Sequence, residues 1–159
     1  MRLPFTKMNG AGNDFVVIDN RDLSVQLDST QIARICDRHR GVGADGLLAV
    51  EPARGDADFR FRYYNADGGE AEMCGNGARC FGRYTARLIP GTQEALCFET
   101  MAGTLSTRIM GDNVEVTMSD PFDLELNSGV SVKGLDTAIH SLNTGCLLYT
   151  SDAADEGHC

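Results

Sequence analysis

The sequence predicts an α+β fold in which a curled, mostly antiparallel sheet wraps around a central helix. Two observations support this class: many short strand-like segments are separated by turn residues, and few segments show helical periodicity. Residues 1–120 are expected to form this domain, and residues 121–145 a linker and the start of a second domain. A chain of 159 residues is long enough for one domain with a substantial core.

Seven segments are predicted to be strands. The clearest is residues 57–64, where apolar or aromatic residues alternate with charged ones at a period of two. A glycine turn at residues 10–12 joins the first two strands, and a tight hairpin at residues 111–112 joins the last two. The predicted strands are residues 3–8, 15–19, 47–51, 57–64, 94–100, 103–110 and 113–119.

The first predicted helix covers about residues 30–39 and is capped by Asp28 or Ser29. Its apolar positions repeat at helical spacing and include Cys36 and His39. Cys36 is therefore expected to be a small core residue, and His39 a partly buried residue without a catalytic role.

The second predicted helix, from about residue 78 to residue 88, follows the stretch Met73-Cys74-Gly75-Asn76-Gly77. Unpaired backbone N–H groups and the helix dipole make the turn before a helix a favourable place for an anion. Gly75 and Gly77 have no Cβ, so backbone amides there can approach a carboxylate closely. Cys74 should hold its thiolate more easily than a free cysteine, so the stretch predicts a base beside a carboxylate site.

Composition and charge exclude several classes of protein. No apolar run approaches the eighteen or so residues of a membrane span, and the net charge of −9 argues against a nucleic-acid partner. The N-terminus has no signal pattern, so a cytoplasmic location is expected. The six cysteines contain no Cys-x-x-Cys pair, so reduced thiols and no metal site are expected. Cys80 and Cys97 are interpreted as core residues.

Two asparagines lie in glycine-containing loops. Asn13 belongs to Gly-Ala-Gly-Asn-Asp-Phe at residues 10–15, and Asn65 opens Asn-Ala-Asp-Gly at residues 65–68. Taken alone, each asparagine is a favourable turn residue in any fold.

Together with Cys-Gly-Asn-Gly-Ala-Arg at residues 74–79, these blocks resemble the diaminopimelate epimerases in order and spacing, over roughly residues 3–145. The cysteine block is the specific signal, because short glycine motifs recur by chance. The resemblance implies a fold of two pseudo-symmetric halves, of which this chain would be the first. It also implies an isomerase that interconverts LL- and meso-diaminopimelate, a small-molecule substrate, for lysine and peptidoglycan synthesis.

The resemblance also implies roles for individual residues. Epimerisation without a cofactor needs two acid/base groups, because one group cannot reach both faces of the α-carbon. Cys74 would be one of them, and backbone amides after it would hold the α-carboxylate and stabilise the developing charge. No pyridoxal phosphate is implied, since the two lysines, Lys7 and Lys133, lack a suitable context. The implied substrate-binding residues are Asn13, Asn65, Gly75, Asn76 and Gly77.

The second cysteine of the family lies in a Cys-Gly-Ser-Gly turn that this sequence lacks. Residues 146–159 have no family counterpart and resemble translated adapter DNA, so they are interpreted as a non-native tail. The printed chain is therefore expected to be inactive alone, with an exposed apolar face that makes it dimeric or aggregation-prone. A homodimer is left open for the full-length enzyme.

Two other functions stay open at this point. One is another cofactor-independent amino-acid racemase of the same fold. The other is a non-catalytic binding or thiol module in which Cys74 is a peroxide-sensitive thiolate. The roles of Arg79 and Arg83 are also left open.

Overall fold

A computed structural model describes residues 2–91, 95–118, 120–127 and 140–144. The chain forms two compact units, Met1–Thr117 and Met118–Cys159, and each is described by itself. The predicted tail at residues 146–159, and the first residue of the predicted strand 94–100, lie outside the described residues. The predicted domain boundaries stay predictions.

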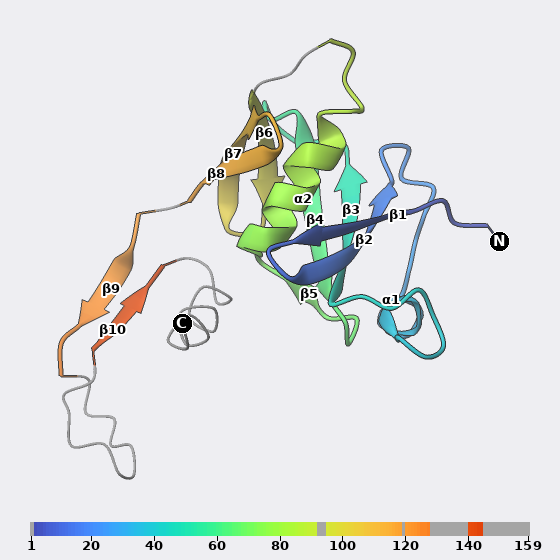
Figure 1. Cartoon of the computed structure of the whole chain (residues 1–159), viewed down its shortest axis with the longest axis horizontal. Helices are drawn as coiled ribbons and strands as arrows, with labels where there is room; N and C mark the ends of the chain where they lie inside the picture. Colours follow the sequence, from blue (N-terminus) through green and yellow to red (C-terminus); the bar gives the residue numbers. More distant parts are fainter. Residues whose placement is uncertain (1, 92–94, 119, 128–139, 145–159) are drawn as a thin grey trace. The chain divides into compact units, whose positions relative to one another are not determined.

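The first unit is built on one eight-stranded sheet (Figure 1). Its order is β1-β2-β3-β4-β6-β7-β8, with β5 paired to β4. The β2–β3 and β4–β6 pairs are parallel and the other pairs are antiparallel. The strands are β1 (Thr6–Gly10), β2 (Asn13–Asp19), β3 (Gly46–Glu51), β4 (Phe59–Asn65), β5 (Glu70–Ala71), β6 (Ala95–Thr100), β7 (Gly103–Met110) and β8 (Asn113–Thr117).

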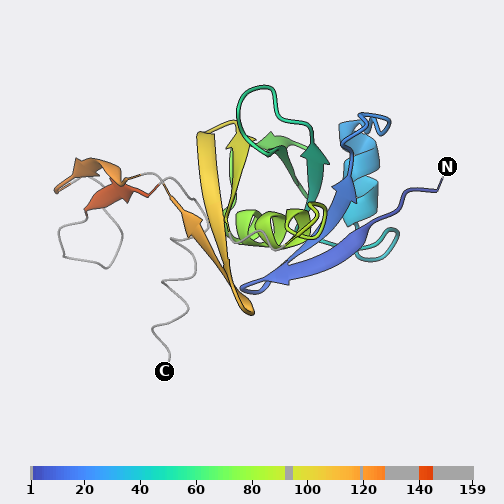
Figure 2. The same cartoon turned by 90° about the horizontal axis from the view of Figure 1, so that it is seen from above.

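The sheet curls around helix α2 (Gly75–Thr85), while helix α1 (Ser29–Cys36) lies outside the curl (Figure 2). The central helix contacts strands at both ends of the sheet, β1 and β8, as well as β2, β3, β4 and β7. The predicted fold class, a mostly antiparallel sheet wrapped around a central helix, is confirmed.

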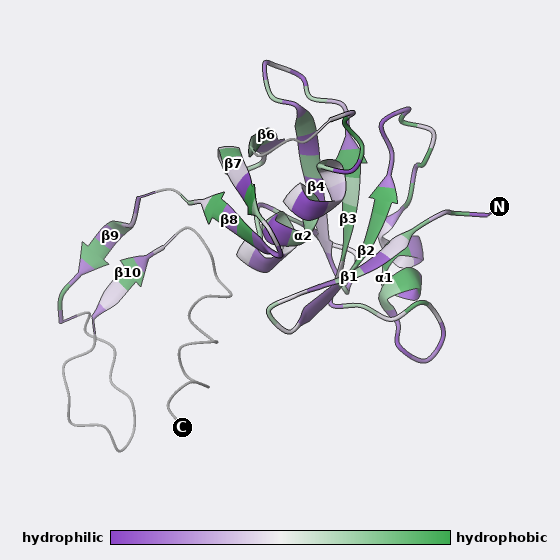
Figure 3. Cartoon of the chain, turned by 45° about the horizontal axis from the view of Figure 1, so that its top comes forward, coloured by the Kyte–Doolittle hydropathy of each residue, from purple (hydrophilic) through white to green (hydrophobic). Residues whose placement is uncertain are grey.

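The core has two layers because β2 and β3 are covered on both faces. Figure 3 shows these strands coloured as hydrophobic along most of their length. On the inner face, the Phe81 ring of α2 lies 5.0 Å from the rings of both Phe61 and Phe98. The outer layer packs α1 against the sheet and consists of Val16, Ile18, Ile32, Cys36, Ala44, Leu47 and Ala49.

Helix α1 has the predicted cap but ends earlier than expected. The Asp28 carboxylate accepts the Gln31 backbone N–H at 2.8 Å, and the Gln31 side chain accepts the Asp28 N–H, which completes a capping box. The helix stops at Cys36 because the Asp37 carboxylate accepts the backbone N–H of His39 at 2.8 Å and forms a turn instead. The prediction for His39 is wrong, since it lies beyond the helix and is exposed.

The cysteine predictions hold for two residues and fail for a third. Cys36 and Cys80 are buried, and burial raises the pKa of both thiols, that of Cys80 to about 11. Cys97 is exposed, contrary to the prediction. Its neighbours Leu96 and Phe98 point into the core, so strand alternation turns Cys97 outward.

The second unit contains a two-stranded antiparallel sheet, in a region where the sequence predicted a linker and the start of a second domain. It pairs β9 (Phe122–Glu125) with β10 (Ser141–Asn143), and every residue of both strands is exposed. Large apolar side chains are among them, with Phe122 and Leu142 exposed by 49% and 44%. This hairpin therefore presents apolar surface that nothing in the described part of its own unit covers.

Candidate functional site

Helix α2 begins earlier than predicted, and this changes the geometry of the cysteine stretch. The glycines were expected in a turn before residue 78, but the helix starts at Gly75 with Cys74 as its N-cap. Cys74 has extended backbone angles, φ −143° and ψ 118°, as N-caps commonly do. The three residues Gly75, Asn76 and Gly77 are therefore the first turn of the helix itself, where N–H groups lack acceptors within the helix.

The Cys74 side chain is turned toward this helix end. Its sulfur accepts the backbone N–H of Gly77 at 3.4 Å, a contact that favours the thiolate. The residue is fully buried. A Cβ on Gly77 would lie 3.3 Å from Leu48 Cδ2 and 3.4 Å from Cys74 Cβ, so glycine lets the sulfur and the sheet pack tightly against the turn.

Asn13 lies beside the same turn because the β1–β2 hairpin folds over it. Ala11 and Gly12 have positive φ angles of 50° and 94°, which close the hairpin at the predicted glycine turn. Asn13 Oδ1 accepts a hydrogen bond from Asn76 Nδ2 at 2.7 Å. A Cβ on Gly10 would lie only 2.7 Å from Asn76 O, so glycine allows this approach.

Asn65 lies at the same end of the sheet, at the end of β4. It is paired with Gly46 on β3, which is paired with Phe15 on β2, two residues after Asn13. The Tyr63 hydroxyl donates a hydrogen bond to Asn65 Oδ1 at 2.7 Å. Asn65 therefore lies near the other site residues through the sheet register and is oriented by Tyr63.

The alternation over residues 57–64 puts Tyr63 on the buried face of its strand but does not reveal its contact with Asn65. Burial, followed by the neighbouring Cys74, raises the pKa of Tyr63, so its hydroxyl stays protonated and can donate. The available signal was a tyrosine in a row whose other members are phenylalanines, because a buried hydroxyl needs a partner.

A cluster of charges adjoins Asn13 and was also not predicted. The Arg38 guanidinium bridges Asp14 at 2.6 Å and Asp45 at 2.8 Å, and Lys7 pairs with Asp14 at 2.7 Å. The hydrogen bond from Arg38 holds the pKa of Asp14 well below its usual range. The second oxygen of Asp45 accepts from the Asp14 backbone N–H at 2.9 Å and from Asn13 Nδ2 at 3.4 Å.

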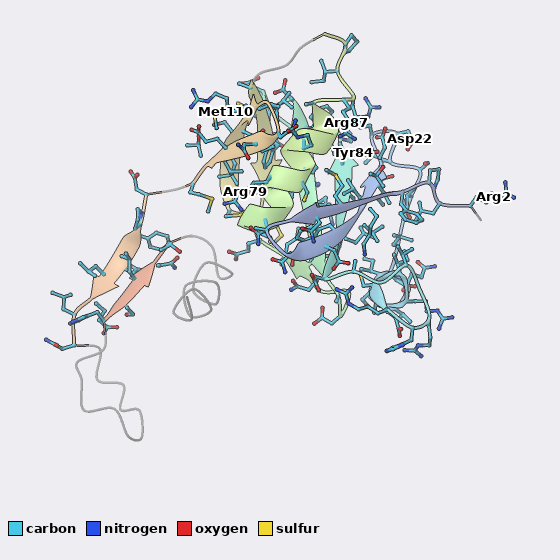
Figure 4. The ribbon with its side chains drawn as sticks, in the orientation of Figure 1. Arg2, Asp22, Arg79, Tyr84, Arg87 and Met110 are labelled. Carbon is cyan, nitrogen blue, oxygen red and sulfur yellow. The ribbon has the colours of Figure 1, made fainter. Side chains whose placement is uncertain are left out.

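The two arginines of α2 have different partners. Arg79, labelled in Figure 4, donates from Nη1 to Asn76 Oδ1 at 2.6 Å. Arg83 donates to the backbone oxygens of Gly111 at 2.7 Å and Asn113 at 3.3 Å, in the β7–β8 hairpin. Both arginines line a pocket of about 320 Å³ with residues of β1 and β8.

Within residues 2–91, 95–118, 120–127 and 140–144, no three His, Cys, Asp or Glu side chains gather as they would around a metal ion. No helix in this described part of the chain is long and apolar enough to cross a membrane.

Comparison with known proteins identifies related sequences. A sequence model of the family Diaminopimelate epimerase matches residues 5–122. The diaminopimelate epimerase of Nitrosospira multiformis is 46% identical over 129 residues, which are 78% of this chain and 47% of that protein. That of Aromatoleum aromaticum is 46% identical over 147 residues, covering 91% of this chain and 53% of that protein. The chain thus spans about half the length of the curated relatives it matches.

Solved structures show the same fold at low sequence identity. A hydroxyproline epimerase from Agrobacterium vitis, solved with trans-4-hydroxy-L-proline, superposes with a TM-score of 0.59 at 16% identity. The match covers 78% of this chain and 43% of that one. At this identity the likeness concerns the curled sheet and its central helix.

Proposed function

Since the chain belongs to the diaminopimelate epimerase family, we propose that it forms one half of a cofactor-independent isomerase that interconverts LL- and meso-diaminopimelate. The reaction removes the α-proton from one face of the carbon and returns a proton to the other face. One acid/base group cannot reach both faces, so two are required. Cys74 is one of these groups in our proposal, and the family resemblance assigns the other to the second half of the complete enzyme.

The observation that carries the proposal is the position of Cys74 as N-cap of α2. A substrate α-carboxylate at this helix end would accept from the amides of Gly75 and Asn76 and share the Gly77 N–H, which also donates to the Cys74 sulfur. The helix dipole would favour it there. Its α-carbon would then lie beside the sulfur. As the proton leaves, negative charge spreads onto the carboxylate, and the same fixed N–H dipoles would stabilise it.

The asparagine contacts support a role in orienting the substrate. Asn65 Oδ1 is occupied by the Tyr63 hydroxyl, and Asn13 Oδ1 by the Asn76 amide. Both asparagines therefore turn their carbonyl oxygens toward the protein. The Asn65 amide nitrogen and the second N–H of Asn13, whose first N–H faces Asp45, are then the groups that could donate to a ligand. Donors of this kind suit the carboxylates of diaminopimelate.

The proposal extends to the state and location of the protein. With Cys74 alone, the printed chain lacks the group for the opposite face, so we propose that it does not epimerise by itself. The acidic charge of −9 supports the absence of a nucleic-acid partner, and a cytoplasmic location belongs to the same proposal. A homodimer of the complete enzyme belongs to the same proposal, and a measurement of its oligomeric state tests it.

Cys74 and its surroundings also bear on the two alternative functions, a thiol module and another racemase of the same fold. Burial of Cys74 limits the access of peroxide and of substrate alike, so a saturable response to diaminopimelate is what separates the epimerase from the thiol module. Another racemase of this fold would share the cysteine and the helix end. Only the choice of substrate separates that alternative from our proposal.

A titration of the nitrogen-15 labelled chain tests the proposal. We expect meso-diaminopimelate to shift the backbone amide resonances of Gly75, Asn76 and Gly77 in a saturable way. L-lysine, which lacks the second carboxylate, and L-proline should bind more weakly. The Cys74→Ser variant should still bind, because serine is also a good N-cap. Equal shifts with lysine or proline would favour another racemase, and no shift with any amino acid would contradict the proposal.

A further inference from the structure

We infer that Arg79 is a positioning residue that fixes the orientation of the Asn76 and Asn13 side-chain amides through a directed chain of hydrogen bonds. The effect of this orientation on the binding of a substrate carboxylate rests on the proposed function. The hydrogen-bond chain itself rests on the contacts of the described residues alone.

The chain starts at a group that can only donate. The Arg79 guanidinium has no acceptor atom, so the atom of Asn76 that faces it must be the amide oxygen. This contact is short, 2.6 Å from Nη1 to Oδ1, as expected for a charged donor. Asn76 is only 6% exposed, so water offers little compensation for the reversed orientation.

The direction set by Arg79 passes to the next amide. With its oxygen toward Arg79, Asn76 must present Nδ2 to Asn13, and Nδ2 can only donate. The atom of Asn13 that receives this bond, at 2.7 Å, is therefore Oδ1. Asn13 in turn must point its own Nδ2 away from the helix.

The far end of the chain is a group that can only accept. Asn13 Nδ2 faces Asp45 Oδ2 at 3.4 Å, and Asp45 is held in place by Arg38 and by the Asp14 N–H. Both ends therefore require the same orientation of the two amides. Because 3.4 Å is long for a hydrogen bond, the Arg79 end determines the orientation more strongly than the Asp45 end.

The orientation matters because of where these amides lie. Asn76 is in the first turn of α2, and Asn13 lies across from it beside the proposed substrate carboxylates. Without Arg79, Asn76 can rotate, and Asn13 loses the donor that keeps its oxygen turned inward. A site built to offer N–H groups would then offer oxygen atoms part of the time, which repels a carboxylate.

Arg83 provides a matched control on the same helix. It follows Arg79 by four residues, so the two side chains lie on one face of α2. Its partners are the backbone oxygens of Gly111 and Asn113, outside the amide chain. A change at Arg83 removes a similar charge and similar packing without altering either asparagine.

The experiment measures the side-chain amide resonances of Asn13 and Asn76 in the labelled chain without substrate. Arg79→Gln places an amide that can either donate or accept at the start of the chain, whereas Arg79→Lys keeps a group that only donates. We expect Arg79→Gln to shift the Asn13 resonances, although the Arg79 guanidinium donates to Asn76, and Arg79→Lys to restore most of the wild-type position. Arg83→Gln should leave Asn13 unchanged.

A second variant tests the chain from the other end. Asp45→Asn replaces the pure acceptor by an amide. We expect it to shift the Asn76 resonances through Asn13, by less than Arg79→Gln shifts those of Asn13, because the Asp45 contact is the weaker end of the chain. If the backbone amide spectrum shows that Arg79→Gln does not fold, the Asp45→Asn variant tests the inference in its place. The inference is overturned if Arg79→Gln moves Asn13 no more than Arg83→Gln does, if Arg79→Lys moves it as far as Arg79→Gln, or if Asp45→Asn leaves Asn76 unmoved.

Titration with meso-diaminopimelate then separates this inference from the proposed function. If the wild type binds and Arg79→Gln binds at least several-fold more weakly, while Arg83→Gln binds normally, both stand. If the resonances shift as expected in the variants but the wild type does not bind diaminopimelate, the amide chain stands and the proposed function fails.

Discussion

At the scale of single residues, the site depends on side chains whose hydrogen-bonding direction is fixed by a partner. Cys74 caps α2 and accepts from Gly77, Asn65 accepts from Tyr63, and Asn13 accepts from Asn76. The glycine motifs predicted Cys74 and both asparagines. They did not predict the partners, because Tyr63 and Arg79 come from elements whose periodicity reveals burial and not hydrogen bonds.

Tyr63→Phe tests the orientation of Asn65. Phenylalanine keeps the ring contact with Phe15, whose centroid lies 6.1 Å away, and removes only the hydroxyl that donates to Asn65. We expect a loss of about 1 kcal/mol in unfolding free energy, typical of one hydrogen bond, and weaker binding of diaminopimelate. Urea unfolding and ligand titration measure the two effects.

Tyr64→Phe is the control, because Tyr64 is the next residue on β4, points to the other face and lies against the Arg62 guanidinium. Diaminopimelate binding that is unchanged in Tyr63→Phe, or weakened equally in Tyr64→Phe, would argue against this role of Tyr63.

The Asp14 cluster predicts how stability depends on pH. Arg38, with Lys7, lowers the pKa of Asp14 below its ordinary value of 3.8, and Arg40 lowers that of Asp37 to about 2. When folding lowers the pKa of a carboxyl group, the ionised group stabilises the folded state at every pH above its pKa in the unfolded chain. This stabilisation is lost as the pH falls to the pKa of the group in the folded protein.

We therefore expect the urea midpoint to change little between pH 7 and pH 5 from these two groups and to drop steadily below about pH 4. Asp14→Asn should lower the midpoint at pH 7 and make the acid-induced drop shallower. A drop of the same size in Asp14→Asn and the wild type would show that the Arg38 cluster does not cause it.

At the scale of elements, alternation and capping predicted what lies within a segment, whereas contacts between segments decided the rest. The buried face of β4 and the Asp28 cap of α1 followed from local patterns. The start of α2 did not, because glycine is a poor helix former and appeared to stand outside the helix. Glycine at position 77 lets the first turn of the helix pack close to the sheet, since a Cβ there would lie 3.3 Å from Leu48 Cδ2.

Gly82→Ala tests whether packing outweighs helix propensity in α2. Alanine favours a helix by about 1 kcal/mol over glycine. At this position its Cβ would lie 2.6 Å from Thr107 Oγ1 and 2.9 Å from Thr107 Cβ on β7. Overpacking costs about 1–3 kcal/mol, so we expect a net loss of stability of about 1 kcal/mol, measured by urea unfolding.

The double variant Gly82→Ala with Thr107→Ala is the control for this prediction. Thr107→Ala removes Oγ1 and Cγ2, two of the three Thr107 atoms that an alanine Cβ at position 82 would crowd. The double variant should therefore be more stable than the sum of the two single changes predicts. An increase in stability for Gly82→Ala alone would show that the helix and β7 separate easily.

At the scale of the whole molecule, the first unit holds the curled sheet and its central helix, and the second unit contains a hairpin with exposed apolar side chains. Leu124 and Leu126 are each 64% exposed. An exposed apolar face was predicted from the sequence, but the pairing of these two strands was not. Strands β9 and β10 are short and pair across a long separation in sequence, which local patterns do not reveal.

This exposed surface predicts self-association of the printed chain. We expect sedimentation velocity to show mass that rises with concentration, and the double variant Leu124→Ser with Leu126→Ser to reduce this rise. Met101→Ser is the control, because Met101 is 58% exposed in the first unit. A concentration-independent monomer would contradict the prediction, as would equal relief by the control.

The central claim is that Cys74 exchanges the substrate α-proton. Its most direct test joins residues 1–120 of this chain to the second half of the Nitrosospira multiformis relative and follows deuterium uptake at the α-carbon of diaminopimelate in heavy water. We expect Cys74→Ser to slow this uptake by about 10²–10⁴-fold, the usual contribution of an acid/base group. Cys80→Ala, a change at a buried thiol of the same helix, should retain it. Deuterium uptake that persists in Cys74→Ser within a few-fold of the parent would contradict the claim.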